Sequence, residues 1–327
     1  MTISEMAGGG SARRGIVYIL LGMLFISVND MLIKLLSDRY PLHQMVFARS
    51  MIGLVVLLGI VQAEGAWRRL WPARPWLQLL RAVLIVIANM TFFAALAVMA
   101  LATATALFFV APLAITALSA LLLGERVGPR RWAAVAVGFL GVLVMLRPWA
   151  GWDGMAPSRW SLLLPVAAAL CYAGMQVLTR KLGATAPASA LALYIQVTFL
   201  AVGAVFFVVA GDGRFAEGVE SESLVFLLKP WVMPPADELW LFGLLGLVSA
   251  GVGYCLSQAY RLGDAATIAP FEYVTLPLAI FWGWALFGEV PGVWVLAGAA
   301  LIAGAGLYVF ARERRVGRGA DFPREGA

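Results

Sequence analysis

Charged side chains interrupt several long apolar stretches of this sequence. Asp30 and Arg49 lie in two consecutive stretches, and Arg81 and Glu272 lie in two others. Inside a lipid bilayer a charged side chain costs at least a few kcal/mol, so each should face the protein interior and have a partner there. A carboxylate in such a place can take up or release a proton, and a guanidinium offers five N–H hydrogen-bond donors in one plane.

Asp30 and Arg49 are the first candidate partners. Each lies roughly 9–12 Å from the same end of its apolar stretch, at a rise of about 1.5 Å per residue, and only a short turn around Pro41 joins the two stretches. The spacing predicts an Asp30–Arg49 ion pair, which could bind substrate or could only clamp two helices. Lys34, one turn after Asp30, is an alternative partner, or it could extend toward the membrane surface.

Glu272 is the second candidate carboxylate. No basic residue lies at a matching place in its own apolar stretch, and a desolvated carboxylate without a cationic partner would suit the uptake and release of a proton. Arg81, placed near the same membrane side in another stretch, could instead pair with it. Tyr273 follows Glu272 directly.

Neutral polar side chains accompany these charges in the apolar stretches and together predict a wet cavity. Each of them could also hold helices together. The predicted substrate-binding set comprises Asn29, Asp30, Arg49, Asn89, Tyr172, Gln176, Tyr254, Gln258, Glu272 and Tyr273, and within it Asp30 and Glu272 are the predicted coupling groups.

The composition identifies the elements that must position these residues. The chain has 327 residues, of which 62% are hydrophobic and only 13% charged, whereas soluble domains carry about 25% charged residues. A membrane-spanning helix needs about 20 apolar residues, so we expect an all-α integral membrane protein. The predicted spans are 15–36, 41–62, 75–97, 102–123, 130–147, 160–180, 187–210, 237–261, 265–288 and 290–311.

The distribution of basic residues predicts the orientation. With both termini in the cytoplasm, about 16 Lys and Arg residues fall on the cytoplasmic side and about 6 outside, as the positive-inside rule requires. The net charge of +6 therefore reflects topology rather than a nucleic-acid partner. The long loop 211–236 falls outside, and its apolar segment 224–228 is too short to span, so we expect it at the membrane surface or as a lid over a pore.

An internal repeat relates the two halves of the chain. Residues 111–126 read APLAITALSALLLGER and residues 276–290 read LPLAIFWGWALFGEV. Lys34 also corresponds to Lys181 if the halves are aligned. Five spans per half make the repeat inverted, a plan that secondary transporters use with the substrate near the repeat interface. Glu125 and Glu289, which end the matched strings, then lie on opposite membrane faces, and we expect each to cap the helix that follows it.

The paired Pro-Leu-Ala-Ile and Gly-Glu strings resemble the drug/metabolite transporter superfamily, in its ten-helix EamA-type branch. The segment Asn29-Asp30…Lys34…Tyr40-Pro41…Gln44…Arg49 also resembles S-adenosylmethionine uptake carriers, more weakly. The resemblance implies ten helices around a central cavity. The expected organisation is a cytoplasmic tail (1–14), two EamA-type repeats (15–147 and 160–311) joined by a linker (148–159), and a basic cytoplasmic tail (312–327).

These features predict a secondary transporter of the bacterial inner membrane that moves a small metabolite by alternating access, with or without proton or exchange coupling. The near-neutral set of buried charges favours an amino-acid-like, zwitterionic or S-adenosylmethionine-like substrate, and a lipid or amphiphile carrier is the alternative. His-Glu-x-x-His, Gly-x-Ser-x-Gly and Walker motifs are absent, so an enzyme or an ATP-driven pump is not expected. We expect no metal and no cofactor; the partners are the metabolite and membrane lipids, and the chain is a monomer or homodimer.

Overall fold

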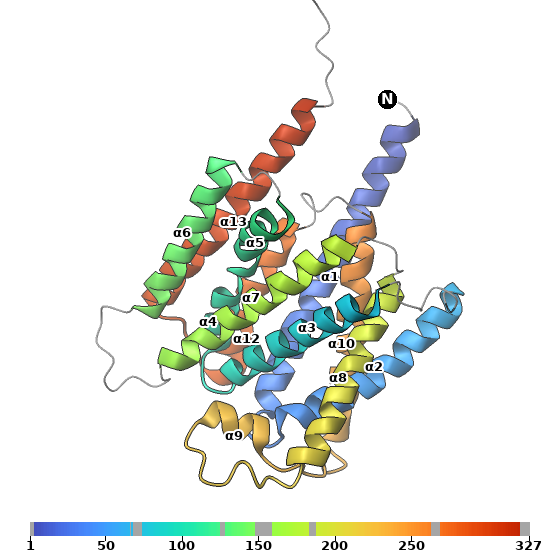
Figure 1. Ribbon diagram of the computed structural model, residues 1–327, viewed down its shortest axis with the longest axis vertical. Helices are drawn as coiled ribbons and strands as arrows, with labels where there is room; N and C mark the ends of the chain where they lie inside the picture. Colours follow the sequence, from blue (N-terminus) through green and yellow to red (C-terminus); the bar gives the residue numbers. More distant parts are fainter. Residues whose placement is uncertain are drawn as a thin grey trace, which may run out of the picture.

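The computed structural model describes residues 3–65, 67, 74–124, 128–147, 159–182, 188–262 and 269–320. Within these ranges every regular element is a helix, which confirms the all-α prediction (Figure 1). The elements are α1 (Ile3–Leu36), α2 (Leu42–Glu64), α3 (Pro75–Leu96), α4 (Leu101–Phe108), α5 (Ala111–Leu123), α6 (Pro129–Leu146), α7 (Arg159–Leu182), α8 (Ala188–Ala210), α9 (Glu222–Leu228), α10 (Leu239–Leu262), the 3-10 helix η2 (Ala269–Val274), α12 (Thr275–Phe287) and α13 (Val293–Ala320).

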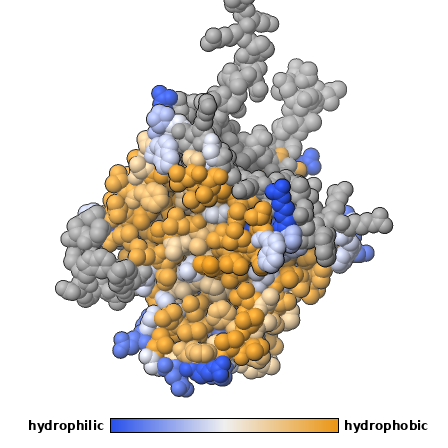
Figure 2. Space-filling view, viewed as in Figure 1, coloured by the Kyte–Doolittle hydropathy of each residue, from blue (hydrophilic) through white to orange (hydrophobic). Residues whose placement is uncertain are grey.

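The helices have the length and composition of a membrane protein. Seven candidate spans of 18 residues or more are apolar enough to cross a bilayer, and three shorter apolar helices accompany them in the described ranges. Figure 2 shows the result on the surface, where a broad apolar area is bordered by hydrophilic residues at the end of the molecule that carries α9. The chain is therefore an integral membrane protein.

Two predicted spans are interrupted. The span predicted at 102–123 is divided into α4 and α5, and the one at 265–288 contains η2 and then α12. In each case a proline, Pro112 or Pro277, lies in the first turn of the second segment. Proline has no N–H to donate and its ring clashes with the preceding turn, so it fits the start of a helix better than its middle.

The long helices pack in pairs that are distant in the sequence. The main pairs are α1 with α10, α3 with α7, α2 with α8, and α6 with α13. Helices α6 and α13 approach closely at Gly141 and Gly298, where a Cβ on Gly141 would lie 2.8 Å from the carbonyl oxygen of Gly298 and a Cβ on Gly298 would lie 2.6 Å from that of Gly141. The small residues Ala300 and Gly304 of α13 do not take part in this contact and are exposed.

The start of α1 and the end of α13 lie at one end of the molecule and α9 lies at the other, here called the α9 end (Figure 1). The segment that precedes α10 is attached to the corner between α1 and α2. Gln44 exchanges two hydrogen bonds with the backbone of Val232, at 2.7 and 3.1 Å, and His43 Nδ1 lies 2.8 Å from the carbonyl oxygen of Leu227. Phe226 of α9 is buried in the core, so the stretch predicted to lie at the membrane surface is anchored to the helix bundle.

Candidate functional site

A cluster of buried polar side chains lies where α1, α2 and α3 meet. Asn29, Asp30 and Arg49 are each at most 7% exposed. Arg49 donates from Nη1 to Asn29 Oδ1 at 3.2 Å and from Nη2 to Asn89 Oδ1 at 2.7 Å. Four residues of the predicted set, from three helices, therefore belong to one hydrogen-bonded cluster.

The predicted direct ion pair between Asp30 and Arg49 is replaced by a bridge through Asn29. The Nδ2 group of Asn29 donates to Asp30 Oδ1 at 3.1 Å, while its Oδ1 accepts from Arg49. An amide can do this because it carries both donors and an acceptor. Asn29 is thereby hydrogen-bonded to both the carboxylate and the guanidinium, and no direct ion pair forms between them.

Two aromatic rings enclose the guanidinium of Arg49. Its central carbon lies 5.4 Å from the ring centre of Phe93 in α3 and 5.3 Å from that of Phe199 in α8. Cation–π contacts of this kind gain strength when water is excluded. The Nε–H group is buried without a hydrogen-bond partner among the described residues, so Arg49 has one unsatisfied donor.

An aromatic row extends from Arg49 across the bundle to the second half of the chain. We define it as Phe93, Phe92, Phe108 and Tyr172, whose successive ring centres are 5.5, 5.2 and 5.5 Å apart. At its far end Gln176 donates to the Tyr172 hydroxyl at 2.7 Å. The row thus connects the Arg49 cluster to two further residues of the predicted set, both in α7.

Glu272 lies in η2 near this far end. The hydroxyl of Tyr172 is close enough to interact electrostatically with both Glu272 and Arg81. Tyr273 is buried against Phe109, with ring centres 4.9 Å apart, and its hydroxyl has no hydrogen-bond partner within the described part of the chain. A Cβ on Gly306 would overlap that hydroxyl, so Tyr273 is held tightly against α13.

Tyr254 and Gln258 lie apart from these residues. Gln258 donates to the Tyr254 hydroxyl at 3.1 Å within α10, and the Tyr254 ring makes an edge contact with Tyr18 of α1 at 6.3 Å. No contact in the described ranges joins them to the aromatic row or to Arg49. The structure therefore separates this pair from the rest of the predicted set.

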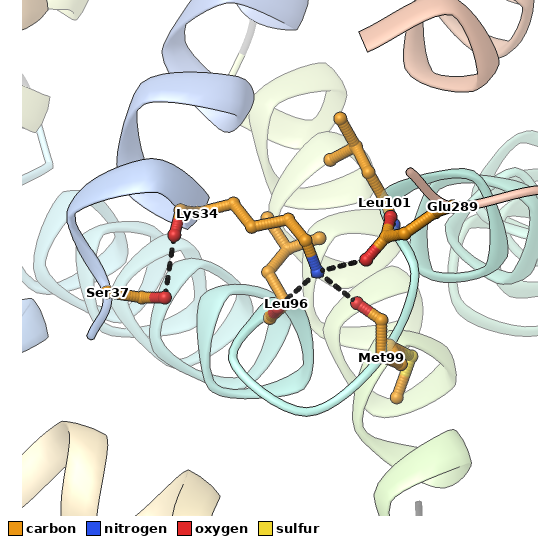
Figure 3. Close-up of polar contacts among 6 residues, drawn as sticks. All are labelled: Lys34, Ser37, Leu96, Met99, Leu101 and Glu289. Atoms are coloured by element: carbon orange, nitrogen blue, oxygen red, sulfur yellow. Dashed lines mark hydrogen bonds and ion pairs between the residues drawn. The ribbon is translucent and has the colours of Figure 1, made fainter. Parts of the chain in front are cut away.

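A second polar cluster, at the α9 end, was not predicted (Figure 3). Lys34 forms an ion pair with Glu289, with Nζ and Oε1 2.9 Å apart. The two are far apart in the sequence, and Lys34 turns neither to Asp30 nor outward as expected. Glu289 does not cap the helix that follows it, because its Oε2 accepts from the backbone N–H of Leu101 in α4 at 3.0 Å. Its repeat counterpart, Glu125, lies outside the described residues.

Glu238, just before α10, makes further contacts at this end. It pairs with Arg39 and accepts a hydrogen bond from the hydroxyl of Tyr40 at 2.5 Å. Burial, together with the carboxylate of Glu238, raises the pKa of Tyr40 to about 12. The Tyr40 hydroxyl therefore stays protonated and remains the donor at any physiological pH.

This arrangement suits noncovalent binding. The Arg49 cluster supplies amide and guanidinium groups, and the aromatic row supplies ring faces beside them. Among the described residues, no group of three His, Cys, Asp or Glu side chains lies close enough to hold a metal ion. The polar members could be predicted from the sequence. The aromatic members Phe92, Phe93, Phe108 and Phe199 could not, since a Phe in an apolar helix gives no signal of its own.

Comparison with known proteins gives consistent matches. The model of the EamA-like transporter family matches residues 13–147. A riboflavin transporter from Rhizobium johnstonii is 34% identical over 241 residues, which cover 74% of this chain and 72% of that protein. An S-adenosylmethionine uptake transporter from Rickettsia prowazekii is 26% identical, covering 92% of this chain and 94% of that protein.

Two more matches extend the comparison. A pseudopaline exporter from Pseudomonas aeruginosa is 28% identical and covers 89% of this chain and 93% of its own length. A solved crystal structure with 21% identity superposes with a TM-score of 0.59, covering 94% of this chain and 99% of that one. The last similarity concerns the fold alone.

Proposed function

The chain belongs to the EamA-like transporter family of the drug/metabolite transporter superfamily, and on that premise we propose that it is a secondary transporter of a small heteroaromatic metabolite, working by alternating access. Riboflavin is the first substrate to test and S-adenosylmethionine the second. The names of two relatives support this choice, and both compounds combine a planar nitrogen heterocycle with polar groups.

The aromatic row beside Arg49 is the observation that carries this proposal. Its ring centres follow one another at 5.2–5.5 Å, close to the separations that stacked or edge-on rings prefer. A planar ring bound against this row gains ring contacts. The unpartnered Nε–H of Arg49 then has an acceptor available among the heterocycle's nitrogen and carbonyl atoms.

The helix packing supports two inverted halves of five spans each. If α1, α2, α3, α4–α5 and α6 correspond to α7, α8, α10, η2–α12 and α13, then the contact between α1 and α10 corresponds to that between α7 and α3. The pairs α2–α8 and α6–α13 correspond to themselves. Transporters built in this way bind substrate between the halves, and the aromatic row crosses from α3 to α7.

In this proposal the chain is oriented with both termini in the cytoplasm, and transport is coupled to protons through Asp30 and Glu272. The excess of Lys and Arg at the end that carries both termini supports a cytoplasmic location for that end, in a bacterial inner membrane. Asp30 is hydrogen-bonded to Asn29 in the Arg49 cluster, and Glu272 is within electrostatic range of the Tyr172 hydroxyl. Each carboxylate thus lies at one end of the aromatic row, where proton uptake or release could respond to substrate.

The test is thermal stabilisation of the purified protein by a panel of metabolites. The panel contains riboflavin, S-adenosylmethionine, amino acids, nucleosides, dicarboxylates and anionic and zwitterionic lipids. The proposal expects riboflavin or S-adenosylmethionine to raise the melting temperature in a saturable way, because a ligand that binds only the folded state stabilises it.

Two variants test whether the metabolite binds at Arg49. In Arg49→Met the stabilisation should be lost, whereas Arg214→Met, which alters an exposed ion pair in the loop before α9, should retain it. Stabilisation by amino acids alone would replace the heteroaromatic class with a zwitterionic one. Stabilisation by lipids alone would favour the lipid-carrier alternative.

A further inference from the structure

Lys34 uses all three of its N–H donors at the α9 end (Figure 3). Besides Glu289 at 2.9 Å, its Nζ donates to the carbonyl oxygens of Leu96 at 3.1 Å and Met99 at 2.6 Å. The Lys34 side chain is 11% exposed and that of Glu289 is 23% exposed. This half-buried pair, unlike a solvated one, is weakly screened by salt.

The two charges also match the helix ends that they contact. Lys34 binds carbonyl groups at and just beyond the C-terminus of α3, where the helix dipole is negative. Glu289 accepts from Leu101, the first residue of α4, where the dipole is positive. Both contacts are favourable in this sense and would be unfavourable if the charges were exchanged.

The chain around Glu289 is shaped to bring this carboxylate into place. Gly288 ends α12 in the left-handed conformation, with φ of 64°, which residues other than glycine adopt at a cost. Gly283 lies one turn earlier, and a Cβ there would be only 3.3 Å from Glu289 Oε2. Two glycines thus permit the turn and the close approach that the ion pair requires.

The pair connects the two halves of the chain at the α9 end of the candidate site. Lys34 and the α3–α4 turn belong to the first half, and Glu289 belongs to the second. From Leu101, whose N–H bonds to Glu289, α4 runs to Phe108 in the aromatic row. Seven residues of helix correspond to about 10 Å, so the pair lies one short helix away from the proposed binding site.

We infer that Lys34 and Glu289 are a gate pair, which closes the path between the halves at the α9 end and must separate for that end to open. This inference rests on the proposed transport function. When the pair separates, α4 is released from the α12–α13 connection, and the row that holds substrate becomes accessible from the α9 end.

The test measures access to α4 without any substrate. Thr105, one turn beyond Leu101, is 4% exposed, and its hydroxyl has no hydrogen-bond partner among the described residues. Thr105→Cys is introduced after both native cysteines are replaced by alanine (C171A, C255A). The rate at which a water-soluble maleimide labels this thiol then reports opening, and Ala104→Cys serves as a second probe if the first variant folds poorly.

Three variants break the pair: Lys34→Met, Glu289→Gln and the two combined. Each should label about tenfold faster than the intact pair, the population shift expected when a charge-assisted hydrogen bond of about 1.4 kcal/mol is lost. The double variant should label no faster than the single ones, because the residues act together. Arg214→Met is the control and should label as slowly as the intact protein.

A rate unchanged by all three variants would overturn the inference, and so would multiplicative effects in the double variant, which mean independent roles. A gate pair should also change the maximal transport rate, and it should do so to the same extent in Lys34→Met, Glu289→Gln and the double variant, while Arg214→Met keeps the rate of the intact protein. Because labelling needs no substrate, failure of every metabolite to bind would refute the proposed function and still leave the gate pair to be decided by the labelling rates.

Discussion

Arg49 donates a hydrogen bond from Nη2 to Asn89 Oδ1 at 2.7 Å, across the interface between α2 and α3. The same guanidinium reaches Asn29 in α1 and contacts the Phe199 ring in α8. One side chain of α2 therefore touches three other helices, two in the first half of the chain and one in the second. A relative movement of the two halves would therefore change the contacts of Arg49.

The amide of Asn29 should be essential to the polar cluster. Asn29→Leu removes one hydrogen bond from Asp30 and one from Arg49 and leaves both charges buried. We expect the free energy of unfolding to fall by about 2–4 kcal/mol, measured by unfolding titration in mixed micelles. Thr91→Val is the control, because Thr91 bonds only to its own helix backbone. Equal stabilities for the two variants would refute the bridging role.

Phe108 should determine preference for aromatic substrates. Phe108→Leu keeps an apolar side chain but removes the ring between Phe92 and Tyr172. Stacking on one ring contributes roughly 1–3 kcal/mol, so the dissociation constant of the heteroaromatic ligand should rise about tenfold in a titration of the purified protein. Phe281→Leu, at an exposed ring, should leave it unchanged. Equal effects of the two substitutions would exclude the row from binding.

Gly288 should be required for the turn that positions Glu289. Gly288→Ala places a side chain at φ of 64°, which costs about 1–2 kcal/mol. We expect a lower unfolding free energy and, when it is combined with Thr105→Cys, faster maleimide labelling of the introduced thiol. Gly59→Ala is the matched control, since a Cβ there meets nothing within 4 Å in the middle of α2. Alanine at position 59 should stabilise the helix slightly. If Gly59→Ala instead lowered the unfolding free energy as much as Gly288→Ala does, the effect would come from adding a methyl group and not from the turn.

Much of the helix framework is predictable from the apolar stretches and from the prolines and glycines between them. Helices α2, α3, α6, α7 and α8 begin and end within about two residues of the predicted bounds. The interruptions before α5 and α12 were missed although both prolines are visible, because a proline in an apolar stretch is compatible with either a kink or a new helix start. Only the neighbouring helices decide between these outcomes.

The polar residues of the site could be predicted from the sequence, but the hydrogen-bond and ion-pair partners of these residues could not. Burial of a charge in a membrane is costly enough that Asp30 and Arg49 stand out by themselves, and the structure places both in one cluster. Which residue bonds to them depends on how α1 is oriented against α2 and α3, and in the structure Asn29 forms the bridge. Lys34 and Glu289 meet through packing of opposite halves, and no local pattern encodes such a contact.

The most direct test of the account is counterflow of labelled riboflavin and labelled S-adenosylmethionine into proteoliposomes that contain the purified protein. The account predicts saturable uptake of one of them by wild type and by Arg39→Met, an exposed ion-pair variant at the α9 end. Uptake should fall at least about tenfold in Arg49→Met, since the lost contacts to Asn29, Asn89 and a bound ring exceed about 1.4 kcal/mol together. Uptake of either compound that is the same in Arg49→Met as in wild type would contradict it.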